Sequence, residues 1–371
     1  MQITQHSWTK EDGWVSESAP SPKANLVLVF ADTEYFRASQ CYETLRTIFP
    51  IAHIVGCSSS GNILGTEISD ETIVATAVTL DKASVRLLTE TVEPGQDLSA
   101  LTANMMSRLD SPDLRHVFVL SDGLSVNGSN LAGGLNSIDV PVTGGLAGDG
   151  ARFASTWVMA DAPARQNLVA IVGFFGPLEI KSGCVAGWRE FGAERYVTRS
   201  VGNVVYEIDH KPALEIYTKY LGEMAKELPS SGLRFPLSVR PTELDKPVIR
   251  TLLGTDEAEQ SLTFAGDVNQ GSLCRLMKTD LDSLVAAAGT AANEAKTGAH
   301  TNPELCIVVS CVGRRLVLGQ MAEEELDIIR DEFGPSTVIA GFYSYGELAP
   351  FNDVVKCQLH NQTMTVTTFS E

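Results

Sequence analysis

A glycine-rich phrase near the carboxyl end of the chain carries residue types suited to holding a small molecule. It reads Gly341-Phe-Tyr-Ser-Tyr-Gly-Glu-Leu-Ala-Pro350 and follows the apolar run Thr337-Val-Ile-Ala340. A buried strand that ends at glycine lets the backbone bend and lets other groups approach closely. Tyrosine offers a flat apolar face with a polar tip, a common feature of ligand pockets. We expect ligand contacts from Phe342, Tyr343, Ser344, Tyr345 and Glu347.

Two related phrases occur earlier in the chain. Val55-Gly-Cys-Ser-Ser-Ser-Gly-Asn62 repeats the outer glycines at the same spacing, and Val142-Thr-Gly-Gly-Leu-Ala-Gly-Asp149 repeats them with one residue fewer. We interpret all three as comparable strand-to-turn corners of a duplicated architecture that converge to enclose a ligand. The first corner adds four expected ligand contacts, namely Cys57, Ser58, Ser59 and Gly61.

The same corner supports an alternative from another class, a hydrolase. Cys57 or a neighbouring serine could act as nucleophile if a histidine base lay beside it, oriented by a third group. His53 is near in sequence, but residues four or five apart on a strand are distant in space. The simpler interpretation is a tight turn whose amides and hydroxyls bond one another.

Arg314 and Arg315 follow Cys311 in a turn that contains glycine and precedes an acidic helix. One of these guanidinium groups, Arg314 being our choice, could clamp a carboxylate ligand in bidentate fashion. The alternative is an ion pair within the protein, for which the candidate partners are Glu323, Glu324 and Glu347.

One histidine stands out as a metal ligand. His360 ends a predicted strand beside Asn361 and Gln362, which could orient its ring, so it is compatible with the axial ligand of a haem. An ordinary hydrogen-bonded turn histidine is the alternative. The seven cysteines lie in apolar segments without a CxxC pair, so we expect buried free thiols rather than a zinc or redox site.

Composition restricts the partners. The 371-residue chain has a formal net charge of −18 and a pI of about 4.8, which argues against nucleic acid and anionic membrane surfaces. It has no apolar run of about 18 residues, the length that a membrane-spanning helix needs. The first ten residues are polar and lack the core of a signal peptide, so we expect a cytoplasmic protein.

The elements that position these residues alternate between strand and helix patterns. Apolar runs at 25–31, 52–56, 116–120 and 305–310 predict buried strands. Stretches with helical periodicity or caps are 33–48, 97–109, 281–296 and 321–333, and residues 156–208 are β-rich with short connections. The fold class is therefore α/β (α+β mixed), with two related modules of mixed, largely antiparallel sheets flanked by helices. A length of 371 residues also favours two domains.

These phrases, together with Cys311-Val-Gly-Arg314 and His360-Asn-Gln-Thr363, resemble the FIST family of bacterial sensory proteins. The resemblance implies an N-terminal extension at 1–24, a FIST N-like domain at 25–205 and a FIST C-like domain at 206–371. It also implies a non-enzymatic sensor that binds a small ligand, with amino acids proposed, and passes the signal to a partner protein.

Bacterial members of this length also resemble the nitric-oxide-sensing haemoproteins called NosP. That resemblance implies haem b held by a histidine and regulation of a separate histidine kinase. His360 is the first candidate ligand, and His210 in Asp209-His-Lys-Pro212 is the second. A haem-based nitric oxide sensor is thus the favoured hypothesis, with direct binding of an amino acid or similar metabolite as the alternative. Homodimerisation is left open.

Overall fold

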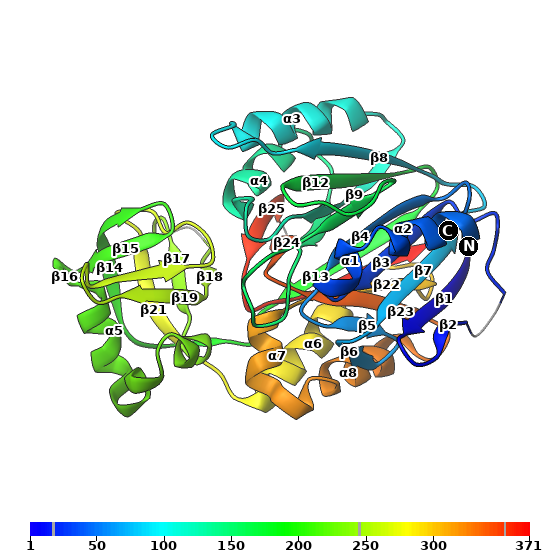
Figure 1. The fold of residues 1–371 in the computed structure, drawn as a ribbon. Helices are drawn as coiled ribbons and strands as arrows, with labels where there is room; N and C mark the ends of the chain where they lie inside the picture. The colour runs from blue at the N-terminus through cyan, green and yellow to red at the C-terminus, as the bar shows by residue number, and fades with distance from the viewer. Residues whose placement is uncertain (17–18, 244–245, 352–353) are drawn as a thin grey trace.

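The computed structural model describes residues 1–16, 19–243, 246–351 and 354–371, which form two bodies of unequal size (Figure 1). The larger body contains three six-stranded sheets and the smaller body contains an eight-stranded sheet. Both chain termini belong to the larger body, where the amino group of Met1 lies 3.7 Å from the carboxylate of Glu371.

The first sheet of the larger body is built around a parallel pair of strands. Its main elements are β1 (Gln2–Thr9), β3 (Leu26–Ala31), α1 (Thr33–Arg37), α2 (Gln40–Ile48), β4 (His53–Ser58) and β7 (Ile73–Thr79). The strand order is β4-β3-β7-β1, and the edge hairpin continues into β2 (Gly13–Ser16). The helix predicted at 33–48 is two helices, because the residue that follows α1, Ala38, is extended.

The other two sheets repeat this arrangement. The second contains β8 (Ser84–Thr91), α3 (Leu98–Leu109), β9 (Leu114–Ser121), α4 (Gly128–Leu135), β10 (Val142–Leu146) and β12 (Leu168–Phe175), in the order β10-β9-β12-β8. The third contains β13 (Glu179–Val185), α6 (Leu281–Lys296), β22 (Leu305–Cys311), α7 (Val312–Leu318), α8 (Glu324–Phe333), β23 (Val338–Ser344) and β26 (Met364–Ser370), in the order β23-β22-β26-β13. In each sheet the first two strands are parallel and the next two pairings are antiparallel.

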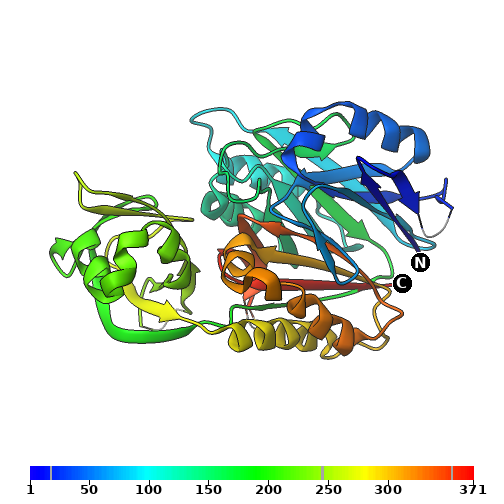
Figure 2. The same ribbon diagram turned by 60° about the horizontal axis from the view of Figure 1, so that its bottom comes forward.

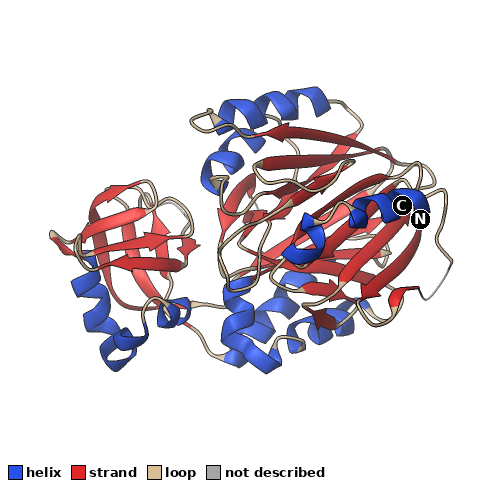
Figure 3. Ribbon diagram, in the orientation of Figure 1, coloured by secondary structure: helices blue, strands red, loops and turns tan. Residues whose placement is uncertain are grey.

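We call the three chain segments that build these sheets the first, second and third units. Each unit also contributes one or two strands to the sheet of another unit, in a cyclic pattern. The hairpin β5 (Asn62–Leu64) and β6 (Glu67–Ser69) from the first unit pairs with β23 of the third. Strand β11 (Val158–Ala160) of the second unit pairs with β4 of the first, and β24 (Gly346–Phe351) with β25 (Val354–His360) of the third pairs with β10 of the second. The strands therefore form the interior, and the helices lie around its outside (Figure 3).

The three corners expected from the sequence are equivalent in space. Each begins at a glycine that faces a valine of the neighbouring parallel strand, the pairs being Gly56 with Val29, Gly144 with Val119 and Gly341 with Val308. A Cβ atom at any of these glycines would overlap the carbonyl oxygen of its valine. The prediction of comparable strand-to-turn corners is confirmed, and it extends to three units.

The smaller body is inserted between β13 and α6 and is joined to the larger one by two chain crossings (Figure 2). Its elements are β14 (Arg189–Val201), β15 (Val204–Ile208), β16 (Lys211–Pro212), α5 (Ala213–Leu221), the short 3-10 helices Gly222–Glu227 and Ser230–Arg234, β17 (Leu237–Arg240), β18 (Val248–Arg250), β19 (Leu252–Asp256), β20 (Ser261–Phe264) and β21 (Leu273–Lys278). It has its own core around Tyr217 and Phe264. The domain boundary expected between residues 205 and 206 falls inside β15.

The fold class is the one expected, mixed α and β with largely antiparallel sheets flanked by helices. All seven cysteines are buried and free, as predicted. Among the helices of the described residues, none combines the length and the apolar character needed to cross a membrane.

Candidate functional site

The three corners meet and bond to one another through their backbones. The amide of Ser60 donates to the carbonyl of Tyr343 at 2.8 Å, and the amide of Tyr343 donates to the carbonyl of Gly61 at the same distance. The amide of Gly148, in the second corner, donates to the carbonyl of Ser58 at 2.9 Å. The predicted convergence is therefore present, but these atoms hold the corners together instead of facing a guest.

Side chains of the first corner are also used internally. The hydroxyl of Ser58 accepts from the amide of Trp157 at 2.9 Å, and that of Ser59 donates to the side-chain oxygen of Asn62 at 2.6 Å. Burial raises the pKa of the Cys57 thiol well above its usual range. His53 bonds Asp161 at 2.7 Å at the opposite end of β4, so this corner has no histidine poised to activate a nucleophile among its described contacts.

The third corner repeats the internal bond of the first. The hydroxyl of Ser344 donates to Glu347 at 2.6 Å, just as Ser59 donates to Asn62. The second carboxylate oxygen of Glu347 accepts from the amide of Thr363 at 3.1 Å and from its hydroxyl at 2.7 Å. Burial raises the pKa of Glu347 to about 7, although these hydrogen bonds oppose the shift.

Arg314 is fully buried and forms an ion pair with Glu325, a residue outside the three carboxylates considered from the sequence. Its Nε lies 2.9 Å from Glu325, and its other nitrogens donate to the carbonyls of Leu284 (2.8 Å) and Ala186. The hydroxyl of Tyr343 donates to the same carboxylate at 3.3 Å. Burial raises the pKa of Glu325, and the charge of Arg314 opposes that shift. Arg314 therefore ties α7 to α8 and α6 and does not face a cavity.

A hollow of about 310 Å³ lies between the two bodies, next to the corners. The larger body contributes residues 123–128, the junction of β22 and α7 at 311–313, Tyr345 and Asn361, and the smaller body contributes residues around Thr251. Among the residues expected to contact a ligand, Tyr345 alone lines this hollow. Its hydroxyl donates to Asp149, and Phe153 stacks on its ring with 4.6 Å between centroids.

The wall of this hollow includes a buried polar group without a partner. Thr251 is 4% exposed, and its hydroxyl has no hydrogen-bond partner in the part of the chain that the structure describes. Its amide donates to the side chain of Asn361 at 3.4 Å across the gap between the bodies. Nothing in the local sequence marks Thr251, because it sits in an ordinary β-rich run and acquires its neighbours only through the fold.

The hollow opens into a larger, mostly apolar one of about 700 Å³. The two share wall residues, which are Leu124, Phe153, Leu233 and Leu253. Phe153, Leu253 and Leu316 are each 42% exposed, although large apolar side chains are usually buried. Together the two hollows form one groove, which we call the interbody groove, with a polar inner end and an apolar outer part.

The histidines do not lie where a haem would need them. His360 is buried, its Nε2 donates to the carbonyl of Ala349 at 3.1 Å, and burial lowers its pKa to about 4. It lines none of the five best-formed hollows of the described residues, and no histidine lines the interbody groove. His210 lines a separate hollow of about 380 Å³ on the smaller body, whose wall also includes Tyr196, Val197, Asp209 and Gln270. Neither histidine therefore lies beside the large apolar part of the interbody groove, the kind of slot that a histidine-ligated porphyrin needs.

Comparisons with known proteins give a consistent assignment. The family model of the FIST N domain matches residues 25–211, and that of the FIST C domain matches residues 213–350. An uncharacterized protein of Methanocaldococcus jannaschii is 22% identical over 357 residues, which is 87% of this chain and 69% of that protein. A crystal structure of chorismatase aligns over the full length of both chains at 9% identity, but its TM-score of 0.35 is too low to support any conclusion.

Proposed function

The chain belongs to the FIST family of sensory domains, and on that premise we propose that it senses a small metabolite bound directly in the interbody groove. The observation that carries this proposal is the buried hydroxyl of Thr251 at the polar end of the groove, which has no hydrogen-bond partner among the described residues. A buried polar group without a partner costs roughly 1–3 kcal/mol, so a ligand that bonds it gains that amount.

The walls favour a ligand with a polar head and an apolar body. No described residue with a charged side chain lines the inner hollow, whose polar side chains include Thr251, Asn361 and Asn203. A ligand with a net charge would lie there without a counter-charge, which is unfavourable in a buried site. A neutral or zwitterionic metabolite with an apolar part fits, and apolar amino acids belong to this class.

The groove also offers a route for the signal. Its walls come from both bodies, which the chain joins by two crossings, so a ligand that contacts both favours one relative arrangement of them. A separate signalling protein would detect that arrangement. A histidine kinase is the partner that the family resemblance suggests.

A panel of amino acids and neutral metabolites tests the proposal through the rise in melting temperature that each causes. We expect at least one apolar amino acid or similar compound to stabilise the wild-type protein. Thr251→Val should reduce its affinity about tenfold, equivalent to the loss of one buried hydrogen bond. Thr263→Val, on the neighbouring strand β20 and outside the groove, is the matched control. Equal binding by both variants would contradict the assignment of the site.

The haem-based version of the sensor rests on the family resemblance alone. A haem would have to be held by a histidine beside a large apolar hollow, and neither His360 nor His210 lines the interbody groove. An absorption spectrum after incubation with haem distinguishes the two versions.

A further inference from the structure

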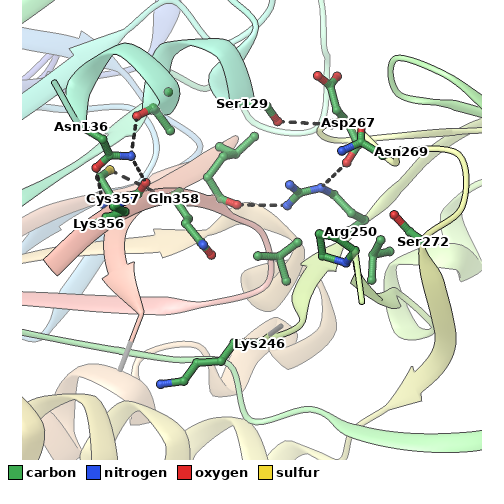
Figure 4. A pocket seen from close by; sticks show the side chains of 16 residues that line it. Ser129, Asn136, Lys246, Arg250, Asp267, Asn269, Ser272, Lys356, Cys357 and Gln358 are labelled. Carbon is green, nitrogen blue, oxygen red and sulfur yellow. Dashed lines mark hydrogen bonds between the residues drawn. The ribbon is translucent and has the colours of Figure 1, made fainter. Parts of the chain in front are cut away.

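A second hollow between the two bodies, of about 610 Å³, lies beside Arg250, the residue that precedes Thr251 in the chain (Figure 4). Its wall is formed by α4 and β25 of the larger body and by β17, β18 and the loop 267–272 of the smaller one. Three basic residues line it, which are Lys246, Arg250 and Lys356. Asp267 is the one acidic residue on the described wall. This basic cluster is notable in a chain whose net charge is −18.

Among the described residues, Arg250 is a buried cation without a counter-ion. It is 6% exposed, and no carboxylate of the described residues lies within salt-bridge distance of it. Its Nε donates to the carbonyl of Asp267 at 3.0 Å, and its Nη1 donates to those of Ile249 (3.1 Å) and Leu359 (3.0 Å). Within the same described set, Nη2 has no hydrogen-bond partner. The carbonyls hold the guanidinium in place and leave its charge unneutralised.

Arg250 and Arg314 differ in whether a carboxylate neutralises the buried guanidinium group. Both guanidinium groups are buried, but Arg314 is neutralised by Glu325. Burial lowers the pKa of Arg250 to about 10, and Asp267 only partly opposes this shift. A buried charge without a counter-charge destabilises the folded state by several kcal/mol. An anion that binds Arg250 would offset this destabilisation, so Arg250 is suited to binding one.

Other groups on the wall lack partners as well. Ser272 is 3% exposed, and its hydroxyl makes no hydrogen bond to the described residues. Lys246 and Lys356 are exposed and form no ion pair there. The carboxylate of Asp267 is engaged by the side-chain amide of Asn127 at 3.1 Å. The wall therefore offers a guanidinium nitrogen, two ammonium groups and a hydroxyl from separate directions.

We propose that this cavity binds the phosphate group of a small phosphorylated metabolite. Among the described residues of the wall, three cations and one carboxylate give a net formal charge of about +2, which matches the dianion of a phosphate monoester. Arg250 presents one free nitrogen, so the bidentate fork that suits a planar carboxylate is not available. A tetrahedral phosphate has three oxygens that accept from separate donors, and lysines bind it as point charges. The volume of about 610 Å³ leaves room for a sugar or nucleoside attached to the phosphate.

Isothermal titration of the full chain with inorganic phosphate, glucose 6-phosphate and adenosine monophosphate tests this inference, with succinate as the carboxylate probe. We expect the phosphate compounds to bind and succinate to bind more weakly. Strong binding of a phosphate ester with weak binding of inorganic phosphate would show that the attached group contributes. Preference for succinate, or no phosphate binding at millimolar concentration, would overturn the proposal.

Substitutions at the exposed lysines assign the binding to this cavity without disturbing the core. The double variant Lys246→Met and Lys356→Met should weaken phosphate binding by about tenfold or more, because two charge-assisted contacts are lost. Lys211→Met, an exposed lysine of the smaller body away from the cavity, should bind as the wild type does. Unchanged binding by the double variant would refute the site. The result is independent of the interbody groove, which is tested with a neutral ligand and with Thr251→Val.

Discussion

Arg250 and Thr251 are neighbours in the chain, yet their side chains line two different hollows. Arg250 ends β18 and faces the basic cavity, whereas Thr251 faces the polar end of the interbody groove. Successive side chains of an extended segment point in opposite directions, so a single peptide unit separates the two sites. Leu359 of β25 also belongs to both walls. The segment is therefore a partition between two candidate binding sites.

Thr251→Val is expected to stabilise the ligand-free protein by about 1 kcal/mol. Valine has nearly the same shape as threonine and removes a buried hydroxyl that has no partner among the described residues. Thermal and urea denaturation measure the change, and Thr263→Val provides the comparison. A loss of stability comparable to that of a core truncation would mean that the hydroxyl is bonded in the free protein.

Alanine at any of the three corner glycines is expected to destabilise the larger body strongly, by about 4 kcal/mol or to the point of insolubility. A methyl group at Gly56, Gly144 or Gly341 would overlap a carbonyl oxygen of the neighbouring parallel strand, which cannot move without breaking the sheet. Gly254→Ala is the control, because no atom lies within 4 Å of the position its Cβ would take. Similar soluble yield and melting temperature for all four variants would contradict the steric requirement for glycine at the corners.

The stability of the protein is expected to depend on the protonation of Glu347. Burial raises its pKa to about 7, above the usual value of 4.5, so the folded state binds this proton more tightly than the unfolded chain. The contribution of Glu347 to the free energy of unfolding therefore decreases as the pH rises from 4.5 to about 7 and is constant above that. Glu347→Gln lacks this dependence. The free energy of unfolding of the wild type minus that of the variant should therefore decrease as the pH rises from 4.5 to about 7.

Buried histidines, among them His116 and His360, act in the opposite direction and make the comparison with a variant necessary. Burial lowers the pKa of His116 to about 3 and that of His360 to about 4, so stability is lost as the pH falls below the usual histidine value of 6.5. Both contributions are common to the wild type and Glu347→Gln and cancel in the difference. Glu215→Gln, which removes an exposed carboxylate, is the control for the loss of a negative charge. Parallel curves for wild type and Glu347→Gln would show that Glu347 titrates normally.

Arg314→Met is expected to cost about 3–5 kcal/mol, because it leaves the carboxylate of Glu325 buried without its counter-charge. The double variant Arg314→Met with Glu325→Met should recover part of the loss. Arg199→Met breaks an exposed pair with Glu207 and should cost less than about 1 kcal/mol. Denaturation of the three variants measures these values. If Arg314→Met keeps its stability but loses ligand binding, the clamp expected from the sequence is correct after all.

Incubation with haem is expected to leave the purified protein without the Soret band of a histidine-ligated haem. The reason is that no histidine lines the interbody groove and that the Nε2 of His360 is bonded to Ala349. A stable Soret band that disappears in His210→Ala or His360→Ala would instead support the haem-based sensor and identify its ligand. Circular dichroism of each variant guards against loss of folding.

The corner phrases could be recognised from the sequence because their roles are local. Glycine at the start of each corner is required by a contact inside one parallel pair, and the bonds of Ser59 to Asn62 and of Ser344 to Glu347 span only three residues. Apolar runs likewise indicated the buried strands and with them the fold class. Such features depend on nearest neighbours, so spacing along the chain is enough to find them.

The candidate binding sites depended on contacts that no local pattern encodes. Arg314 has a carboxylate 11 residues away as its partner, and Thr251 meets Asn361 across 110 residues. The cyclic exchange of strands brings the corners together so tightly that they bond one another, which leaves the hollows at the junction with the inserted smaller body. The sequence by itself thus determined the family, the strand-rich class and the repeated corners. The tertiary structure decided which side chains face empty space, because exposure to a cavity is set by segments distant in the chain.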